Sequence, residues 1–248
     1  MNHRLQKIIA RAGLASRRAA EQMIAQGRVS VNGTIVTTAG TTADPEHDCI
    51  AVDGIPLERG HAKIAVMLHK PSGCITSLHD PQGRPTVMQW LGGIAERLFP
   101  VGRLDYDTEG LLVLTNDGAL AHLLMHPRHG FDRTYAVKIT GEPSAAKLAR
   151  LRAGMVIEGV RMTMRRVAVI KRAQKNTWIE IVLREGRNRQ IKKMLDAIGC
   201  RTLRIIRTGF GPLTLGDLPP GCWRQLTREE LHRIEAAACR NFAPTAHK

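Results

Sequence analysis

The sequence contains no run of about 18 apolar residues, the length that a membrane-spanning helix requires. Its first residues also lack the apolar stretch of about 7 to 15 residues and the small-residue cleavage site of a secretory signal. Hydrophobic residues make up 43% of the chain and charged residues 24%, as in water-soluble globular proteins. We therefore expect a cytoplasmic protein that has no membrane partner.

Motifs for metals and common cofactors are also missing. The cysteines are five in number, scattered, and include no CxxC pair: Cys49, Cys74, Cys200, Cys222 and Cys239. No HExxH pair occurs, and Pro127 argues against a shared helical face for His126 and His129. The chain has no Walker motif, and Gly209-Phe210-Gly211 lacks the third glycine of a GxGxxG loop. We expect reduced, structural thiols and no metal site.

Acidic residues are scarce compared with basic ones. The chain has 37 lysines and arginines against 22 aspartates and glutamates, which gives a net charge of +15 and a pI near 10.4. Such an excess is typical of proteins that bind phosphate groups, so nucleic acid is the favoured partner. Basic chains can also bind membrane surfaces or simply stay soluble, and charge alone leaves these alternatives open.

The first 58 residues predict a small domain of two helices and a sheet. In residues 3–28 the apolar side chains follow helical spacing in two short segments, with Ser16 as N-cap of the second helix and Gly27 as its stop. The apolar period then changes to two, which predicts two β-hairpins. Their turns are Asn32-Gly33 and Asp53-Gly54.

Charges in this first domain are segregated along the chain. Residues 1–28 carry one acid, Glu21, and six bases: Arg4, Lys7, Arg11, Arg17, Arg18 and Arg28. Residues 44–58 carry five acids and no lysine or arginine. A solvated helix surface would account for any single arginine, but the cluster favours a face that binds phosphates.

A second domain follows a linker that we place at residues 58–62. Strands are expected at 64–68, 110–115, 135–139, 167–170 and 178–183, and helices at 118–125, 144–153, 188–198 and 227–237. Helix starts are expected at Asp117, Ser144 and the capping box Thr227-x-x-Glu230, and helix ends at Gly154 and Gly199. We therefore expect a mixed α+β domain at residues 63–240 and a loose tail at 241–248.

Two stretches of the second domain are candidates for function. In GRLDYDTEGLLVLTNDG, residues 102–118, Asp105 lies between Arg103 and Leu104 on one side and a buried strand on the other, a setting that can keep a carboxylate ionised and poorly solvated. The alternative is that Asp105 orders a turn through its side chain. The other stretch, residues 184–207, contains eight bases, and those at the start of its helix oppose the helix dipole.

Two family resemblances follow from these motifs. The segment RLQKIIARAGLASRRAAEQMIAQGRVSVNG, with the later IAVDG turn, resembles the RNA-binding domain named after the fourth protein of the small ribosomal subunit. A further set of motifs occurs in the order found in ribosomal RNA pseudouridine synthases, which these motifs resemble. They are GRLDYDTEGLLVLTNDG, LMHP, the Arg-Thr-Tyr run at 133–135, EGRNRQIKKM and GCWRQLT. HKPSGCITSLHDPQGRPTV, residues 69–87, resembles the opening motif of the same family. The resemblance covers residues 3–234.

This resemblance implies a role for individual residues. Asp105 would be the nucleophile, and Tyr135 would stack on the target base and help to remove the proton from C5. The cation that pairs with Asp105 would be Lys192, with Arg187 as the second candidate; many relatives have arginine at the position of Lys192. We also expect Arg103, Arg187 and Arg189 to bind RNA.

The family needs no metal and no organic cofactor, so none is expected. The expected partner is ribosomal RNA or a pre-ribosomal particle, and we expect a monomer. Residues 98–129 resemble the large-subunit branch more than the small-subunit branch.

The alternatives are a small-subunit target, a non-catalytic RNA-binding assembly factor, which would need neither Asp105 nor Tyr135, and a DNA-binding regulator. The last would leave the large second domain unexplained, and no dimerising segment is evident.

Overall fold

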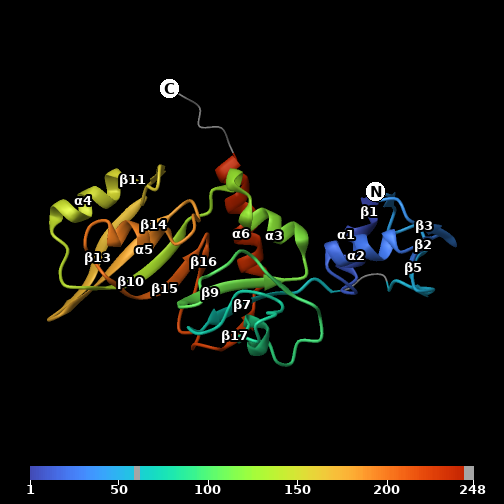
Figure 1. Cartoon of the computed structure of the whole chain (residues 1–248), viewed down its shortest axis with the longest axis horizontal. Helices are drawn as coiled ribbons and strands as arrows, with labels where there is room; N and C mark the ends of the chain where they lie inside the picture. The colour runs from blue at the N-terminus through green and yellow to red at the C-terminus, as the bar shows by residue number, and fades with distance from the viewer. Residues whose placement is uncertain (59–61, 243–248) are drawn as a thin grey trace, which may run out of the picture. The chain divides into compact units, whose positions relative to one another are not determined.

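The structure is a computed structural model that describes residues 1–58 and 62–242. The chain divides into two compact units, most of whose elements are labelled in Figure 1. The first unit contains residues 1–64, 94–98 and 116–118, and the second contains residues 65–93, 99–115 and the chain from Ala119 onward. Each unit has a hydrophobic core of its own.

Two helices and small antiparallel sheets make up the first unit. Its elements are β1 (His3–Arg4), α1 (Leu5–Arg11), α2 (Arg17–Ala25), β2 (Val29–Val31), β3 (Thr34–Val36), β4 (Thr42–Ala43), β5 (Ile50–Val52) and β6 (Ile55–Pro56). Strands β3, β2, β5 and β6 form one sheet in that order, and β1 pairs with β4. The core between helices and strands includes Leu5, Ile9, Ile24 and Val29.

The predicted caps and turns of this unit are confirmed. The Ser16 hydroxyl accepts a hydrogen bond from the backbone N–H of Ala19 at 3.1 Å, and Gly27 follows α2 with a φ of 71°. Both hairpin turns place their two residues at positive φ, between 51° and 81°. Such turns match the twist of the strands they join.

A mixed sheet forms the centre of the second unit. Nine strands of the described chain belong to it: β7 (Ala65–Lys70), β8 (Phe99–Pro100), β9 (Thr108–Thr115), β10 (Arg133–Thr140), β13 (Arg166–Ala173), β14 (Asn176–Leu183), β15 (Thr202–Phe210), β16 (Leu213–Thr214) and β17 (Trp223–Gln225). The main order is β13-β14-β10-β15-β9-β7-β17. Strands β15 and β9 run parallel, and the other neighbours run antiparallel.

Helices cover the two halves of this sheet differently. The remaining elements are η1 (Val87–Trp90), α3 (Gly118–Met125), η2 (Pro127–His129), α4 (Ala145–Ala153), β11 (Met155–Ile157), β12 (Val160–Met162), α5 (Gln190–Asp196) and α6 (Arg228–Phe242). Helices α3 and α6 pack on β7 and β9, where Leu124, Ile234 and Leu111 share one core (Figure 1). Helix α4 contacts β13, and α5 contacts β15.

Most expected elements of the second domain are present. Helix α3 has the predicted bounds, the Thr227 and Glu230 capping box forms as predicted, and the side chain of Ser144 caps α4. The expectation of a loose tail from 241 was wrong at its start, because α6 continues through residues 241 and 242. Residues 59–61 of the expected linker and 243–248 of the tail lie outside the described residues.

Strand β15 was not predicted. Its sequence, TLRIIRTGF, contains three charged or small residues that break the alternation typical of a half-buried strand. It is stabilised instead by strands that are distant in sequence, β10 on one side and β9 on the other. Over the described residues, no helix is long and apolar enough to cross a membrane.

Candidate active site

Asp105 lies in the loop that leads into β9 and is half-buried. The preceding residue, Leu104, is buried, and both of its backbone groups are bound by one side chain. The Thr76 hydroxyl donates to Leu104 O at 2.9 Å and accepts from Leu104 N–H at 3.2 Å. The backbone O of Asp105 itself accepts from the N–H of Thr108 at 3.1 Å. The backbone on both sides of the carboxylate is therefore fixed.

Lys70 holds the other end of this loop. Its side chain is fully buried, and its ammonium donates to three backbone carbonyls: Pro71 O at 3.1 Å, Tyr106 O at 3.3 Å and Thr108 O at 2.9 Å. Burial lowers the pKa of Lys70, whereas the nearby Cys74 and the carboxylates at 105, 107 and 109 act to raise it. An ammonium bound by carbonyls ties β7 to the loop that carries Asp105.

A pocket of about 450 Å³ opens beside Asp105. Ligand pockets commonly fall in this range of size. Its walls come from the loop before β9, from β10, from the loop before α5 and from β15. The polar and charged residues that line it are Arg103, Asp105, Thr108, Arg133, Tyr135, Arg187, Asn188, Arg189, Gln190, Lys192 and Arg207. The lining thus contains one carboxylate, six cations and one phenol.

Tyr135 reaches this pocket from β10. Its residue is 8% exposed, and it is paired with Ile181 of β14 and Arg207 of β15. The pairing with β15 is irregular here, because Thr134 pairs with Gly209 and Tyr135 with Arg207, which leaves Thr208 unpaired. Such a β-bulge re-aims the neighbouring side chains and is common beside active sites.

The ion pair expected between Lys192 and Asp105 does not form in this structure, and its role in the reaction stays a prediction. The Lys192 ammonium instead contacts both carboxylate oxygens of Asp107 at 2.6 Å. Burial raises the pKa of Asp107, but the hydrogen bond and charge of Lys192 outweigh it, so that the pKa lies below its usual value. Asp107 is more accessible than Asp105 and lies two residues farther along the loop, where the Lys192 side chain reaches it.

The second candidate for that pairing, Arg187, is engaged elsewhere. Its Nε donates to a carboxylate oxygen of Glu185 at 2.8 Å. The buried Gln190 accepts weakly from the Arg187 N–H, at 3.4 Å, and donates to Glu185 and to Thr163 O. These contacts order the loop before α5 without bringing Arg187 to Asp105.

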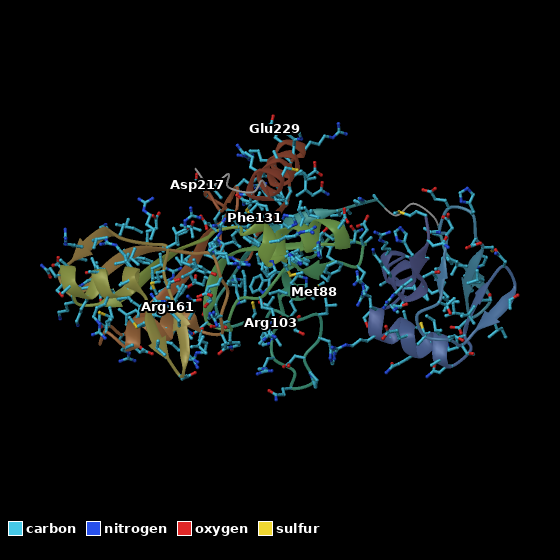
Figure 2. The ribbon with its side chains drawn as sticks, turned by 90° about the horizontal axis from the view of Figure 1, so that it is seen from above. Met88, Arg103, Phe131, Arg161, Asp217 and Glu229 are labelled. Carbon is cyan, nitrogen blue, oxygen red and sulfur yellow. The ribbon has the colours of Figure 1, made fainter. Side chains whose placement is uncertain are left out.

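Other bases of this unit differ in how accessible they are. Arg103, labelled in Figure 2, Arg187 and Arg189 are exposed, as an RNA-binding role requires. Arg189 is the N-cap of α5 and has a φ of 50°, which is uncommon for a residue with a side chain. Two other bases of the stretch 184–207 have different surroundings: Arg204 is exposed but paired with Glu109, and Arg207 is buried.

In the first unit, the six expected phosphate-binding residues are on the surface. Arg4, Arg11, Arg17, Arg18 and Arg28 are exposed and Lys7 is half-buried. Arg28 is the exception in its contacts, because it forms two hydrogen bonds, of 2.8 and 2.6 Å, with the carboxylate of Asp53. Its charge is already partly neutralised.

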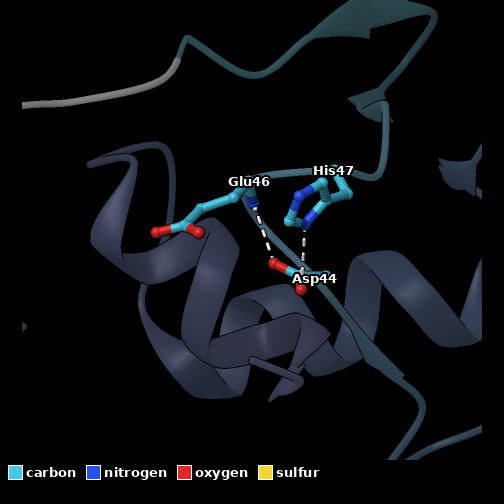
Figure 3. Close-up of side chains that lie close together, drawn as sticks. All are labelled: Asp44, Glu46 and His47. Carbon is cyan, nitrogen blue, oxygen red and sulfur yellow. Dashed lines mark hydrogen bonds and ion pairs between the residues drawn. The ribbon is translucent and has the colours of Figure 1, made fainter.

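A small acidic cluster in the first unit has side chains spaced as metal ligands (Figure 3). It consists of Asp44, Glu46 and His47. The Asp44 carboxylate is occupied by the N-terminal ammonium at 2.6 Å, by the Glu46 backbone N–H at 3.0 Å and by His47 at 3.2 Å. These partners account for the arrangement, and exposed acidic groups of this kind give no argument for an ion.

Comparison with known proteins agrees with this arrangement. A model of the RNA pseudouridylate synthase family matches residues 64–197, and an S4 domain model matches residues 3–49. The chain belongs to the RNA pseudouridine synthase family. Enzymes of this family are intramolecular isomerases. As expected, a small S4 domain precedes a mixed α+β catalytic domain in the sequence.

Relatives and a solved structure support the same assignment. The synthase is 40% identical over 237 residues to the ribosomal large subunit pseudouridine synthase B of Bacillus subtilis, covering 95% of this chain and 96% of that one. An uncharacterized RNA pseudouridine synthase of Aquifex aeolicus is 40% identical, with 98% of each chain covered. A crystal structure of a pseudouridylate synthase superposes with a TM-score of 0.65 at 30% identity, covering 93% of this chain and 99% of that one.

Two residues that fix the active loop were missed by reasoning from the sequence. Lys70 and Thr76 both lie in the stretch HKPSGCITSLHDPQGRPTV, which was noted only for its resemblance. The one available signal was a lysine at the end of an apolar strand, but lysine is rarely buried, so the sequence did not predict its burial. Its contacts with the loop before β9 could not be anticipated, because 35 or more residues separate them in sequence.

Proposed function

We propose that this synthase converts a uridine of large-subunit ribosomal RNA to pseudouridine, with Asp105 as nucleophile. The observation that carries the proposal is the shared pocket of Asp105, from the loop before β9, and Tyr135, from β10. A merely structural aspartate would need neither a pocket nor a phenol beside it. We place the target in large-subunit ribosomal RNA because several relatives are named for that subunit.

The reaction rearranges bonds within one nucleotide. The bond between C1′ and N1 breaks, a bond between C1′ and C5 forms, C5 loses a proton and N1 gains one. Asp105 provides the carboxylate that attacks the sugar or the base, and Tyr135 stacks on the base and helps to remove the C5 proton. No atom is added or lost, and the side chains in the pocket can supply both roles.

The target uridine must leave its stack before it can enter the pocket, which costs a few kcal/mol. Contacts with phosphates elsewhere on the RNA offset this cost. We assign these contacts to Arg103, Arg187 and Arg189 around the pocket and to the exposed bases of α1 and α2 in the S4 domain. The domain boundaries at residues 58 and 63 and a monomeric state are part of the same proposal.

The test is a map of pseudouridines in ribosomal RNA from cells that lack this protein. The proposal predicts that one position in large-subunit RNA loses its modification and regains it with the wild-type gene but not with Asp105→Asn. Asp196→Asn, the same chemical change at an exposed position of α5, is the matched control and should restore the modification.

Other outcomes of that map decide between the alternatives. Loss of a position in small-subunit RNA would contradict the proposed target. An unchanged map, together with slowed ribosome assembly, would favour a non-catalytic assembly factor. Purified Asp105→Asn should bind RNA within about 3-fold of the wild type, because the change is nearly isosteric; activity that survives in it would contradict the role of Asp105.

A further inference from the structure

Arg207 is a charged side chain that the reaction described above does not use. Its residue is 2% exposed, and its Nε donates to Leu111 O at 2.7 Å. Its Nη2 is buried and has no hydrogen-bond partner among the described residues. No carboxylate of the described chain forms an ion pair with it. An unpaired buried charge is costly, so its retention calls for an explanation.

The backbone places Arg207 between the two active-site strands. On one side it pairs with Tyr135 of β10, next to the bulge at Thr208. On the other side it pairs with Gly110 of β9, in parallel register. A Cβ atom at Gly110 would lie 2.3 Å from Arg207 O, and Gly110 has a φ of 106°, so glycine is required for this close approach.

The guanidinium lies beside the phenol. Directly opposite residues of antiparallel strands present their side chains on the same face, and both Tyr135 and Arg207 line the pocket. Burial lowers the pKa of Arg207, and the charge and hydrogen bonding of the Tyr135 hydroxyl act against that shift. Phe210 makes cation–π contacts with two arginines: the Cζ atoms of Arg207 and Arg133 each lie 5.2 Å from its ring centroid.

We propose that Arg207 is the positioning residue for Tyr135, holding its hydroxyl toward C5 of the target uracil. The inference rests on the proposed function and adds a residue to it. The hydroxyl proton first passes to solvent, the phenol oxygen then takes the proton from C5, and N1 takes a proton from solvent, so that no proton is gained or lost overall. Negative charge that develops on that oxygen meets a cation that is already in place. Such a fixed charge in a poorly solvated site is effective because it needs no reorganisation during the reaction.

This role differs from that of a residue retained for folding. Replacing buried ion pairs by apolar side chains of similar volume is often neutral for stability, and replacing Arg207 leaves no carboxylate without its partner. Arg207→Met should therefore remain folded, with a thermal midpoint close to that of the wild type, and bind RNA within about 3-fold. Its single-turnover rate at saturating RNA should fall about 100-fold, in the range that proton-transfer groups contribute.

The deciding experiment is a double-mutant cycle in the full chain with ribosomal RNA as substrate. If Arg207 acts through Tyr135, Arg207→Met should cost less than about 3-fold when Tyr135→Phe is already present. Arg207→Lys, which keeps the charge, should be slowed by only about 10-fold. The matched control is Arg152→Met, which also removes a guanidinium bound to a backbone carbonyl but lies on α4 outside the pocket; its rate should equal the wild-type rate.

Two results would overturn the proposal. One is a wild-type rate for Arg207→Met; the other is a loss of the same size with and without the Tyr135 hydroxyl, which would mean that Arg207 acts independently of Tyr135. If Arg207→Met is unfolded, the cycle with Arg207→Lys makes the same comparison. Failure of the proposed function looks different, because the wild-type protein itself would then form no pseudouridine.

Discussion

Positive charge is arranged differently in the two units. In the first unit, Arg17 and Arg18 stand exposed in the first turn of α2, where they oppose the helix dipole. In the second unit, Lys70 and Arg207 are buried against backbone carbonyls around the loop and strands of the active site. Exposed cations of this kind are suited to binding phosphates, whereas buried ones fix the backbone and the side chains beside them. A net charge of +15 conceals this division.

The largest effect is expected for Lys70→Met. Three carbonyl oxygens lose their donor, so the free energy of unfolding should fall by about 2 kcal/mol. The loop that carries Asp105 loosens, and the single-turnover rate at saturating RNA should fall about 100-fold. Denaturant unfolding and single-turnover assays measure the two effects.

The control for this change is Lys171→Met on β13, an exposed lysine whose replacement should alter stability by less than about 0.5 kcal/mol. If Lys70→Met keeps the wild-type rate, the buried Lys70 has no part in catalysis. That result would contradict the claim that buried cations of the second unit hold the active site in place.

A smaller effect, about 10-fold in rate, is expected for Lys192→Ala, since one pocket cation is lost while the backbone stays in place. With Lys192 present, the pKa of Asp107 is depressed, so the stability contributed by the pair is present above about pH 4 and is lost below it. In the variant, Asp107 carries an unbalanced charge beside the pocket until it is protonated. The ratio of wild-type to variant rate should therefore shrink as pH falls.

The same measurement tests the pairing predicted from the resemblance. If the ammonium served Asp105 when RNA is bound, the variant would have more of its nucleophile protonated, and the defect would ease as pH rises. The two ion pairs thus predict opposite trends. Adding Asp107→Asn should recover rate only if Lys192 acts by neutralising Asp107.

The double change Arg17→Ala and Arg18→Ala should affect binding alone. Removing cations from a helix start leaves stability within about 0.5 kcal/mol of the wild type. If each arginine contacts one phosphate, the slope of log affinity against log salt should become shallower by about 1.5 units. The rate at saturating RNA should not change. An unaltered salt slope would show that α2 does not contact the RNA backbone.

The smallest effect is expected for Arg28→Ala. Because Asp53 already neutralises much of the Arg28 charge, the salt slope should change by less than about 0.5 units. The hydrogen bonds from Arg28 lower the pKa of Asp53, so the pair stabilises the fold above about pH 4 and ceases to do so as pH falls below that value. A change in salt slope as large as that for a fully exposed arginine would place Arg28 on the RNA interface.

Much of the fold could be predicted because its signals are local. The turns at Asn32-Gly33 and Asp53-Gly54, the Ser16 cap and the bounds of α3 depend on residues that are close in sequence. Strand β15 could not be predicted, because it is held by β10 and β9, whose pairing partners lie more than sixty residues away. The bulge that aims Tyr135 and Arg207 belongs to that same pairing.

The sequence by itself determined the two-part organisation, the excess of positive charge and the motifs that identify Asp105 and Tyr135 as candidates. It could not distinguish a cation that binds phosphate from one that holds the fold, since Arg187, Arg204 and Arg207 belong to one basic stretch. Only the tertiary structure exposes the first, pairs the second with Glu109 and buries the third beside Tyr135. The physical reason is that a charge is worth little in water and much in a poorly solvated interior, and burial depends on contacts between distant segments.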